Sequence, residues 1–246
     1  MPFLEICVDG ARGVRAALDG GADRVELCSA LEVGGLTPSS GLVAFTVALG
    51  IPARAMIRPR AGSFVFNDDE ECVMHQDIAG MMALGIEGVV LGASHLDGRL
   101  NVDLLQRLVA TAREAGARGL TLHRAIDLTP NLEEAVDQAV GLGFDTVLSS
   151  GGALTAPEGI SMLSRMHHRA PTSLTIMAGS GVTPLTVGTL VAATGITAVH
   201  ASARSRVHPT DPKLVAFGFS KAGGQSADGA TVRAIRNALD ARGPAC

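Results

Sequence analysis

The sequence contains no tryptophan and no tyrosine, and aromatic residues make up only 3% of its 246 positions. Proteins that bind single-stranded nucleic acid stack the bases on aromatic side chains, so this scarcity argues against that class. Lysine and arginine are scattered rather than clustered, and the formal net charge is −4, which indicates no basic surface for DNA or RNA. We therefore expect no nucleic-acid partner.

Long hydrophobic runs are missing too. No apolar stretch approaches the roughly 18 residues that a membrane-spanning helix needs, and the first residues, MPFLEICVDG, lack the basic and apolar regions of a signal peptide. Cysteine occurs only four times, and no two cysteines form a CxxC unit. Free thiols in a reducing compartment are therefore a better interpretation than disulfides. These absences predict a cytoplasmic protein without a membrane segment.

What the chain does have is a repeated alternation of short β-favouring segments and helical stretches. Thr37, Thr129 and Thr183 each precede a proline, and we expect each threonine to be the N-cap of a helix. Eight strand–helix units without a break in composition predict a single (β/α)₈ TIM-type barrel, one domain over residues 1–246. The eight expected strands cover residues 3–8, 24–29, 53–58, 87–92, 118–124, 145–150, 173–178 and 197–202.

Two of these strands repeat one pattern, an acid and a thiol two residues apart. In FLEICV, Glu5 and Cys7 alternate with apolar residues, and in RVELCS, Glu26 and Cys28 do the same. Side chains of a strand alternate between its two faces, and the face toward the helices of a barrel must be apolar. We therefore expect all four polar side chains to point into the barrel.

The same alternation turns His123 and His200 inward and places Arg58 at the end of the third strand. Residues near the carboxyl ends of barrel strands lie at the mouth, where barrel enzymes have their active sites. Asp127 follows His123 by four residues, in a position to orient either His123 or Arg124. Because buried ionisable groups need partners and cluster at functional sites, this interior predicts a functional pocket.

Several motifs occur along the chain in the order LEICVDG, GADRVELCSALEVGGLTPS, MIRPRAGSFVF, LHRAIDLT, VLSSGG, MAGSGV and VHASARS. Together they resemble the CutC family of cytosolic copper-homeostasis proteins, over about residues 1–205. The resemblance implies a role in copper homeostasis and the barrel fold. It has one departure: the family pattern His-Cys-Ser-Ala-Arg reads His-Ala-Ser-Ala-Arg here, with Ala201 in place of the thiol.

The metal that the resemblance implies is copper. Cys7 and Cys28 match the family's thiols, and two thiolates at similar height on neighbouring strands suit Cu(I), a soft ion that favours sulfur. The other interpretation is that both are small, buried core residues, as free cysteines often are. Both interpretations stay open at this point.

The rival function is a barrel enzyme that acts on a small, phosphorylated molecule by acid–base chemistry. Its catalytic residues would be Glu5, Glu26, Arg58, His123, Asp127 and His200, unless these form only a structural ion-pair network. The loops after the seventh and eighth strands would hold an anion or phosphate through Gly179, Ser180, Gly181, Ser202 and Arg204, unless they are simple tight turns. A Schiff-base aldolase is nearly excluded, because it needs a lysine inside the barrel and no lysine precedes Lys213.

Two segments are unusually apolar for loops. The first segment is residues 58–67, which read RPRAGSFVFN. It suggests either a lid with exposed phenylalanines or a surface that packs on another subunit. Residues 213–219, KLVAFGF, suggest a cover for the mouth or an oligomer contact. We therefore expect a homo-oligomer whose partners are a copper ion or a small anionic ligand.

Overall fold

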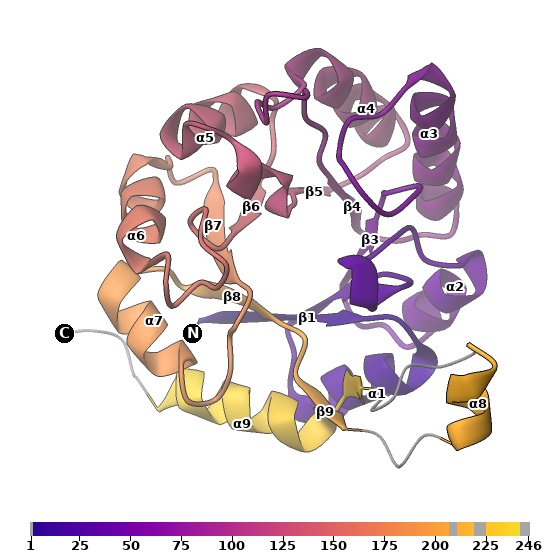
Figure 1. The fold of residues 1–246 in the computed structure, drawn as a ribbon, viewed down its shortest axis with the longest axis vertical. Coiled ribbons are helices and arrows are strands. Elements are labelled where there is room, and N and C mark those ends of the chain that lie inside the picture. Colours follow the sequence, from indigo (N-terminus) through magenta and orange to yellow (C-terminus); the bar gives the residue numbers. More distant parts are fainter. Residues whose placement is uncertain (1, 207–210, 219–224, 242–246) are drawn as a thin grey trace.

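A computed structural model describes residues 2–206, 211–218 and 225–241 of the chain. Eight parallel strands form a closed barrel in sequence order, and helices surround it (Figure 1). The predicted (β/α)₈ TIM-type barrel is thereby confirmed. The strands are β1 (Phe3–Val8), β2 (Arg24–Leu27), β3 (Ala53–Met56), β4 (Gly88–Leu91), β5 (Gly119–Leu122), β6 (Thr146–Ser149), β7 (Thr175–Gly179) and β8 (Ala198–Ala201).

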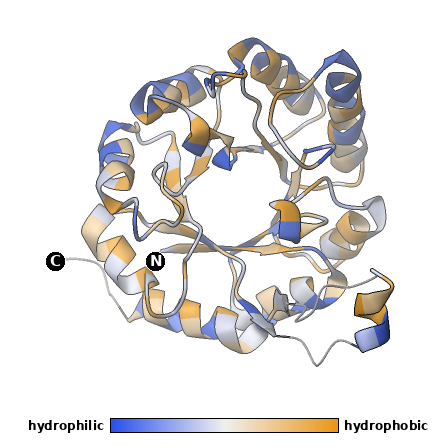
Figure 2. Cartoon of the chain, in the orientation of Figure 1, coloured by the Kyte–Doolittle hydropathy of each residue, from blue (hydrophilic) through white to orange (hydrophobic). Residues whose placement is uncertain are grey.

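The outer layer consists of helices that follow the strands, each with apolar residues on the side that faces the barrel. In Figure 2 these helices carry both hydrophobic and hydrophilic residues. They are α1 (Ala11–Gly20), α2 (Ser40–Ala48), α3 (Asp68–Ala83), α4 (Val102–Glu114), α5 (Leu132–Gly141), α6 (Ile160–Arg169), α7 (Val187–Thr194) and α9 (Gly229–Asp240). Shorter elements are η1 (Leu31–Val33), η2 (Arg124–Leu128), α8 (Pro212–Ala216) and an antiparallel pair of β9 (Arg204–Arg206) and β10 (Gln225–Ala227).

The predicted helix N-caps at Thr37, Thr129 and Thr183 were wrong by two or three residues. Each Thr-Pro pair belongs to the turn before the helix. The α2 and α5 caps accept a hydrogen bond from a backbone N–H three residues further on, which leaves the prolines outside the helix. The observed N-caps are Ser39, Asn131 and Thr186.

The main hydrophobic core lies between the barrel and its helices. Leu4 and Ile6 of β1 and Val25 and Leu27 of β2 are fully buried there. Their neighbours along the same strands must then face the barrel interior, because successive side chains of a strand alternate. Strand parity therefore directs the polar residues of β1 and β2 into the barrel, as the sequence predicted.

The register between strands sets which inward residues lie side by side. Glu5 is paired with Arg24 of β2 on one side and with His200 of β8 on the other, and Cys7 is paired with Glu26. These pairings close the barrel across β1. They bring together residues almost 200 positions apart in the sequence.

The opposite, amino-terminal end of the barrel is filled by Arg54 of β3. Its guanidinium donates to the hydroxyl groups of Thr121 and Thr146, and it forms an ion pair with Asp145 at 2.7 Å. Gly119 makes room for this side chain, since a Cβ there would lie 2.3 Å from a guanidinium nitrogen. Arg54 is buried with its charge compensated, so this end is packed and structural.

Candidate functional site

A cavity of about 630 Å³ opens at the carboxyl ends of the strands. It is lined on the β1, β2 and β8 side by Cys7, Glu26 and His200, and on the β5 side by His123 and other residues. Because β5 lies across the barrel from β1 (Figure 1), the cavity spans the whole mouth. Two walls with different chemistry therefore face one space.

The first wall, formed by Cys7, Glu26 and His200, is supported by Glu5, which is fully buried. Its carboxylate accepts hydrogen bonds from Arg24 Nε at 2.5 Å and from His200 Nδ1 at 2.8 Å. Burial alone would raise the pKa of Glu5, but the Arg24 charge and His200 outweigh it and lower that pKa to about 2. Glu5 is therefore ionised, and it fixes the orientation of the His200 ring.

His200 consequently presents its other nitrogen, Nε2, to the cavity. This atom lies 3.8 Å from Glu26 Oε2. The Cys7 thiol, the Glu26 carboxylate and His200 each offer one ligand atom, and these atoms all lie within 4.8 Å of one another. All three side chains are buried, and Glu26 Oε1 has no hydrogen-bond partner among the described residues. The arrangement suits a metal ion with one sulfur, one nitrogen and one oxygen donor.

The cluster is electrostatically coupled. Burial raises the pKa of the Glu26 carboxyl, and the nearby charge of Glu5 adds to this effect. Burial acts to lower the pKa of His200, but the charges of Cys7 and Glu26 and the hydrogen bonds to Cys7 and Glu5 raise it well above its usual value. A proton is therefore held in this cluster, and a metal ion would have to displace it.

Cys28 contacts this cluster through Glu26. Its thiol donates to Glu26 Oε2 at 3.5 Å, and it packs with Met56, Val90 and Leu31. Burial, followed by the charge of Glu26, raises the pKa of the Cys28 thiol. The register pairs Cys7 with Glu26 rather than with Cys28, and Cys28 is not one of the three residues whose ligand atoms lie within 4.8 Å of one another. That both bind metal stays a prediction.

The second wall is formed by His123, Arg58 and Phe64. The Phe64 ring lies 4.8 Å from the Arg58 guanidinium carbon and 4.9 Å from the centre of the His123 ring. Arg58 Nη1 donates to the carbonyls of Val33 and Gly35. The phenylalanines of residues 58–67 are half-buried rather than exposed, because they stack on arginines of their own loop.

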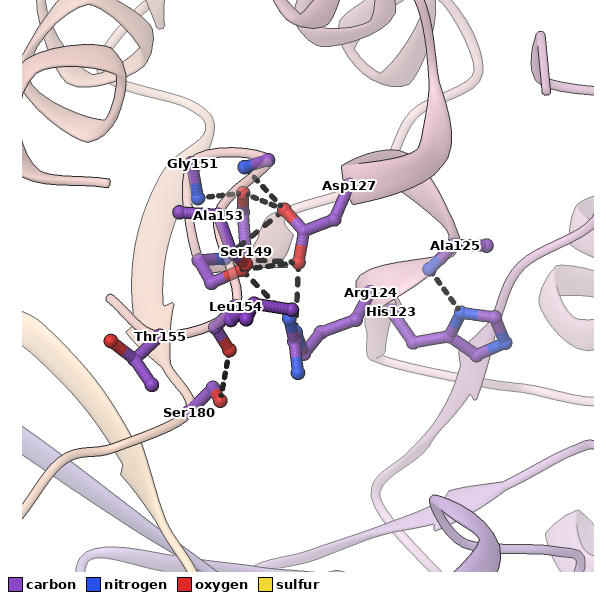
Figure 3. A network of polar contacts seen from close by, with 12 residues as sticks. His123, Arg124, Ala125, Asp127, Ser149, Gly151, Ala153, Leu154, Thr155 and Ser180 are labelled. Carbon is purple, nitrogen blue, oxygen red and sulfur yellow. Dashed lines mark hydrogen bonds and ion pairs between the residues drawn. The ribbon is translucent and has the colours of Figure 1, made fainter. Parts of the chain in front are cut away.

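Asp127 does not orient His123. Its carboxylate accepts hydrogen bonds from Arg124 Nε at 2.8 Å, from Ser149 Oγ at 2.5 Å and from both the backbone and the hydroxyl of Ser150 (Figure 3). The Gly152 amide donates to it as well. Of the two orienting roles considered for Asp127, the structure therefore has the one toward Arg124. Through these bonds Asp127 ties η2 to the loop after β6.

The predicted anion-binding residues lie at the mouth after β7 and β8. Ser180, Gly181, Ser202 and Arg204 line the cavity, whereas Gly179 packs beneath it against Leu148 and His200. Ser180 has a φ of 76° and its hydroxyl donates to the Leu154 carbonyl. Arg204 lies 4.0 Å from Asp9. That these residues hold an anion or phosphate stays a prediction.

Sequence reasoning missed Arg24, the ion-pair partner of Glu5, and Arg54. Both alternate with apolar or small residues in their strands, so the parity that placed Glu26 and Arg58 inward also applies to them. It missed Ser149 and Ser150 as partners of Asp127 for a different reason. No local pattern connects η2 to a loop more than twenty residues away.

Comparisons with known proteins place the chain among relatives of one kind. The family model described as "CutC family" matches residues 3–205. Curated relatives described as family protein CutC, from Sinorhizobium medicae and Rhizobium meliloti, are each 48% identical and cover 97% of this chain and 96% of their own length. A crystal structure of a candidate copper homeostasis protein CutC from Streptococcus agalactiae is 30% identical, with a TM-score of 0.77 over 82% of this chain and 99% of that one.

Within the part of the chain that the structure describes, no helix is both long enough and apolar enough to cross a bilayer.

Proposed function

The chain belongs to the CutC family, and from that premise we propose that it is a cytoplasmic copper-homeostasis protein that binds copper at the mouth of its barrel. The observation that carries the proposal is the buried cluster of Cys7, Glu26 and His200, with its ligand atoms within 4.8 Å of one another. Copper is here the cargo that the protein handles. The CutC structure from Streptococcus agalactiae is itself described in terms of copper homeostasis.

The donor set fits a copper ion. A thiolate and an imidazole nitrogen are ligands that Cu(I) favours, and Glu26 Oε1 is a buried oxygen without a partner among the described residues. Cys28, which touches the cluster through Glu26, is the second sulfur that the resemblance implies. Glu5 supports the site from below, since a carboxylate on His200 Nδ1 keeps the ring oriented and raises its basicity.

A competition experiment tests the proposal. Purified protein is titrated with Cu(I) under anaerobic conditions against a coloured Cu(I) chelator. We expect the Cys7→Ser and His200→Gln variants to bind Cu(I) at least about tenfold more weakly than wild type, because each removes a ligand. Cys72→Ser is the matched control, since Cys72 is an exposed cysteine on α3.

The Cys28→Ser variant separates the two possible ligand sets. Weaker binding in this variant would add Cys28 to the ligands, whereas unchanged binding would restrict the site to Cys7, Glu26 and His200. Equal Cu(I) affinity in wild type, Cys7→Ser and His200→Gln would contradict the proposed site.

The alternative of an acid–base enzyme stays a prediction, and one observation bears on its residue roles. Glu5 is engaged by Arg24 and His200, and Asp127 by several donors, so neither has an unpaired carboxylate oxygen as Glu26 has. If the cavity hosts proton transfer, Glu26 and His200 are the residues best placed for it.

We also propose that the protein forms a homo-oligomer through the rim of the barrel mouth. The support is a set of exposed leucines in the loops after β4, β5, β6 and β7, which a second copy could cover. These leucines are Leu96, Leu128, Leu154 and Leu185. Sedimentation velocity tests the proposal. We expect a mass above that of the monomer for wild type and a mass closer to the monomer for Leu185→Asp, and a monomeric wild type would contradict the proposal.

A further inference from the structure

The wall of the cavity around β5 has a different character from the Cys7 cluster. It carries two buried nitrogen donors that lack acceptors among residues 2–206, 211–218 and 225–241, namely His123 Nε2 and Arg58 Nε. Both side chains line the same cavity. Buried N–H groups without partners are uncommon in native proteins, so each needs a reason.

The state of the His123 ring follows from its other nitrogen. Nδ1 accepts a hydrogen bond from the Ala125 amide at 3.1 Å, so it carries no proton (Figure 3). Burial, with a contribution from the Arg58 charge, lowers the pKa of His123 to about 3, which keeps the ring neutral. A neutral imidazole with a bare Nδ1 has its proton on Nε2. His123 is therefore a fixed N–H donor.

The His123 ring is also held in place. It lies against Gly92, where a Cβ would come within 2.1 Å of its Cε1 atom, and against the Phe64 ring on another side. Only 3% of the residue is exposed. The donor cannot swing away to find an acceptor elsewhere, so its partner must come into the cavity.

Arg58 differs from the other two buried arginines of the described chain. Arg24 has the Glu5 carboxylate and Arg54 has the Asp145 carboxylate, whereas no carboxylate of the described residues lies within 4 Å of Arg58. Its terminal nitrogens donate only to backbone carbonyls. Arg58 is 5% exposed, so its positive charge is buried without a counter-ion. The carbonyls and the Phe64 ring offset part of this charge, but no opposite charge among the described residues does.

Phe64 joins the two donors into one surface. Its ring contacts both the Arg58 guanidinium and the His123 ring, at 4.8 and 4.9 Å. We propose that this surface binds the carboxylate or phosphate group of a small organic molecule, with Arg58 as the compensating charge and His123 Nε2–H as a hydrogen-bond donor. Oxyanions take up charge-assisted hydrogen bonds of this kind. The proposal goes beyond copper binding and does not depend on it, because the residues of the Cys7 cluster take no part.

Anion titrations of metal-free, full-length protein test the proposal. Inorganic phosphate and malonate serve as the two probes, at constant ionic strength set with sodium chloride. Isothermal titration calorimetry gives the affinity, and the ¹⁵N NMR signal of His123 Nε2 reports the contact directly. We expect saturable binding of at least one probe, with a shift of the His123 signal that follows the same curve. The tighter probe identifies the chemistry of the group.

Variants show whether the named donors are responsible. We expect His123→Phe, which keeps a ring but removes the donor, and Arg58→Met to weaken binding about tenfold or more, with Arg58→Lys in between because it keeps the charge. Arg99→Met is the matched control, since Arg99 is an exposed arginine next to Asp97.

Three results would overturn the proposal. These are no saturable binding of either probe, a His123 signal that stays fixed at saturation, or equal affinity in wild type and a folded His123→Phe variant. The wild-type NMR titration decides the matter even if a variant does not fold. Since no copper is present, failure here leaves the copper-binding proposal untouched, and failure of copper binding leaves this one untouched.

Discussion

Replacing Glu5 with glutamine is expected to destabilise the fold strongly. Glu5 is fully buried and is the acceptor for Arg24 Nε and His200 Nδ1. Its pKa falls from 4.5 to about 2 in the folded protein, a difference worth about 3 kcal/mol at roughly 1.4 kcal/mol for each pH unit. Removing one partner of a buried ion pair costs about 3–5 kcal/mol by a separate line of reasoning. The two magnitudes agree.

The dependence on pH has a definite sign. Because the pKa of Glu5 is lower in the folded than in the unfolded chain, its contribution is fully present above about pH 4.5. It is lost as the pH falls from there toward about 2. The Glu5→Gln variant lacks this contribution at every pH, so its free energy of unfolding should change less across this range than that of wild type.

Urea unfolding of the metal-free protein, followed by circular dichroism, measures the effect. Circular dichroism is preferable to fluorescence because the chain has no tryptophan and no tyrosine. The matched control is Asp137→Asn, which breaks a solvent-exposed ion pair with Arg169 and should change the free energy of unfolding far less than Glu5→Gln does. A loss for Glu5→Gln as small as that of the control, at pH 7, would refute the ionised, buried role assigned to Glu5.

Three further predictions follow from the packing of the barrel. Arg54→Met should lower the free energy of unfolding by about 3 kcal/mol in urea, because it leaves Asp145 without its ion-pair partner; a loss under about 1 kcal/mol would contradict this. Gly92→Ala should destabilise by about 1–3 kcal/mol in thermal unfolding, since its Cβ would meet the His123 ring, whereas Gly80→Ala, with nothing within 4 Å, should not destabilise at all. Because the pKa of His123 falls from 6.5 to about 3 on folding, wild type should lose stability as the pH drops from 6.5 toward 3. His123→Gln should remove that part of the pH dependence, and parallel curves would count against a neutral buried ring.

Most of the site could be predicted from strand parity, which tells which side chains point into the barrel. The alternation in FLEICV and RVELCS correctly turned Glu5, Cys7 and Glu26 into the barrel, because an apolar face toward the helices leaves the polar face no other place. The family followed from motifs spread over most of the chain, and the family comparisons confirm it.

Strand parity could not predict the register between neighbouring strands. Two neighbouring strands can be paired at several registers with the same residues inward, and only the structure shows that Cys7 is paired with Glu26 and that Cys28 is not in the cluster. Contacts between distant loops were equally out of reach. Phe64 looked exposed in its loop, yet it stacks on Arg58 and His123 because the fold brings those residues together.

The central claim is that Cys7 and His200 hold copper at the mouth of the barrel. The most direct measurement is anomalous diffraction at the copper edge from crystals of the wild-type protein soaked anaerobically with Cu(I). The account predicts a peak bounded by Cys7 Sγ and His200 Nε2, at the boundary between β1 and β8. An empty mouth, with copper found instead on the surface of α3 beside Cys72 and His75, would contradict it.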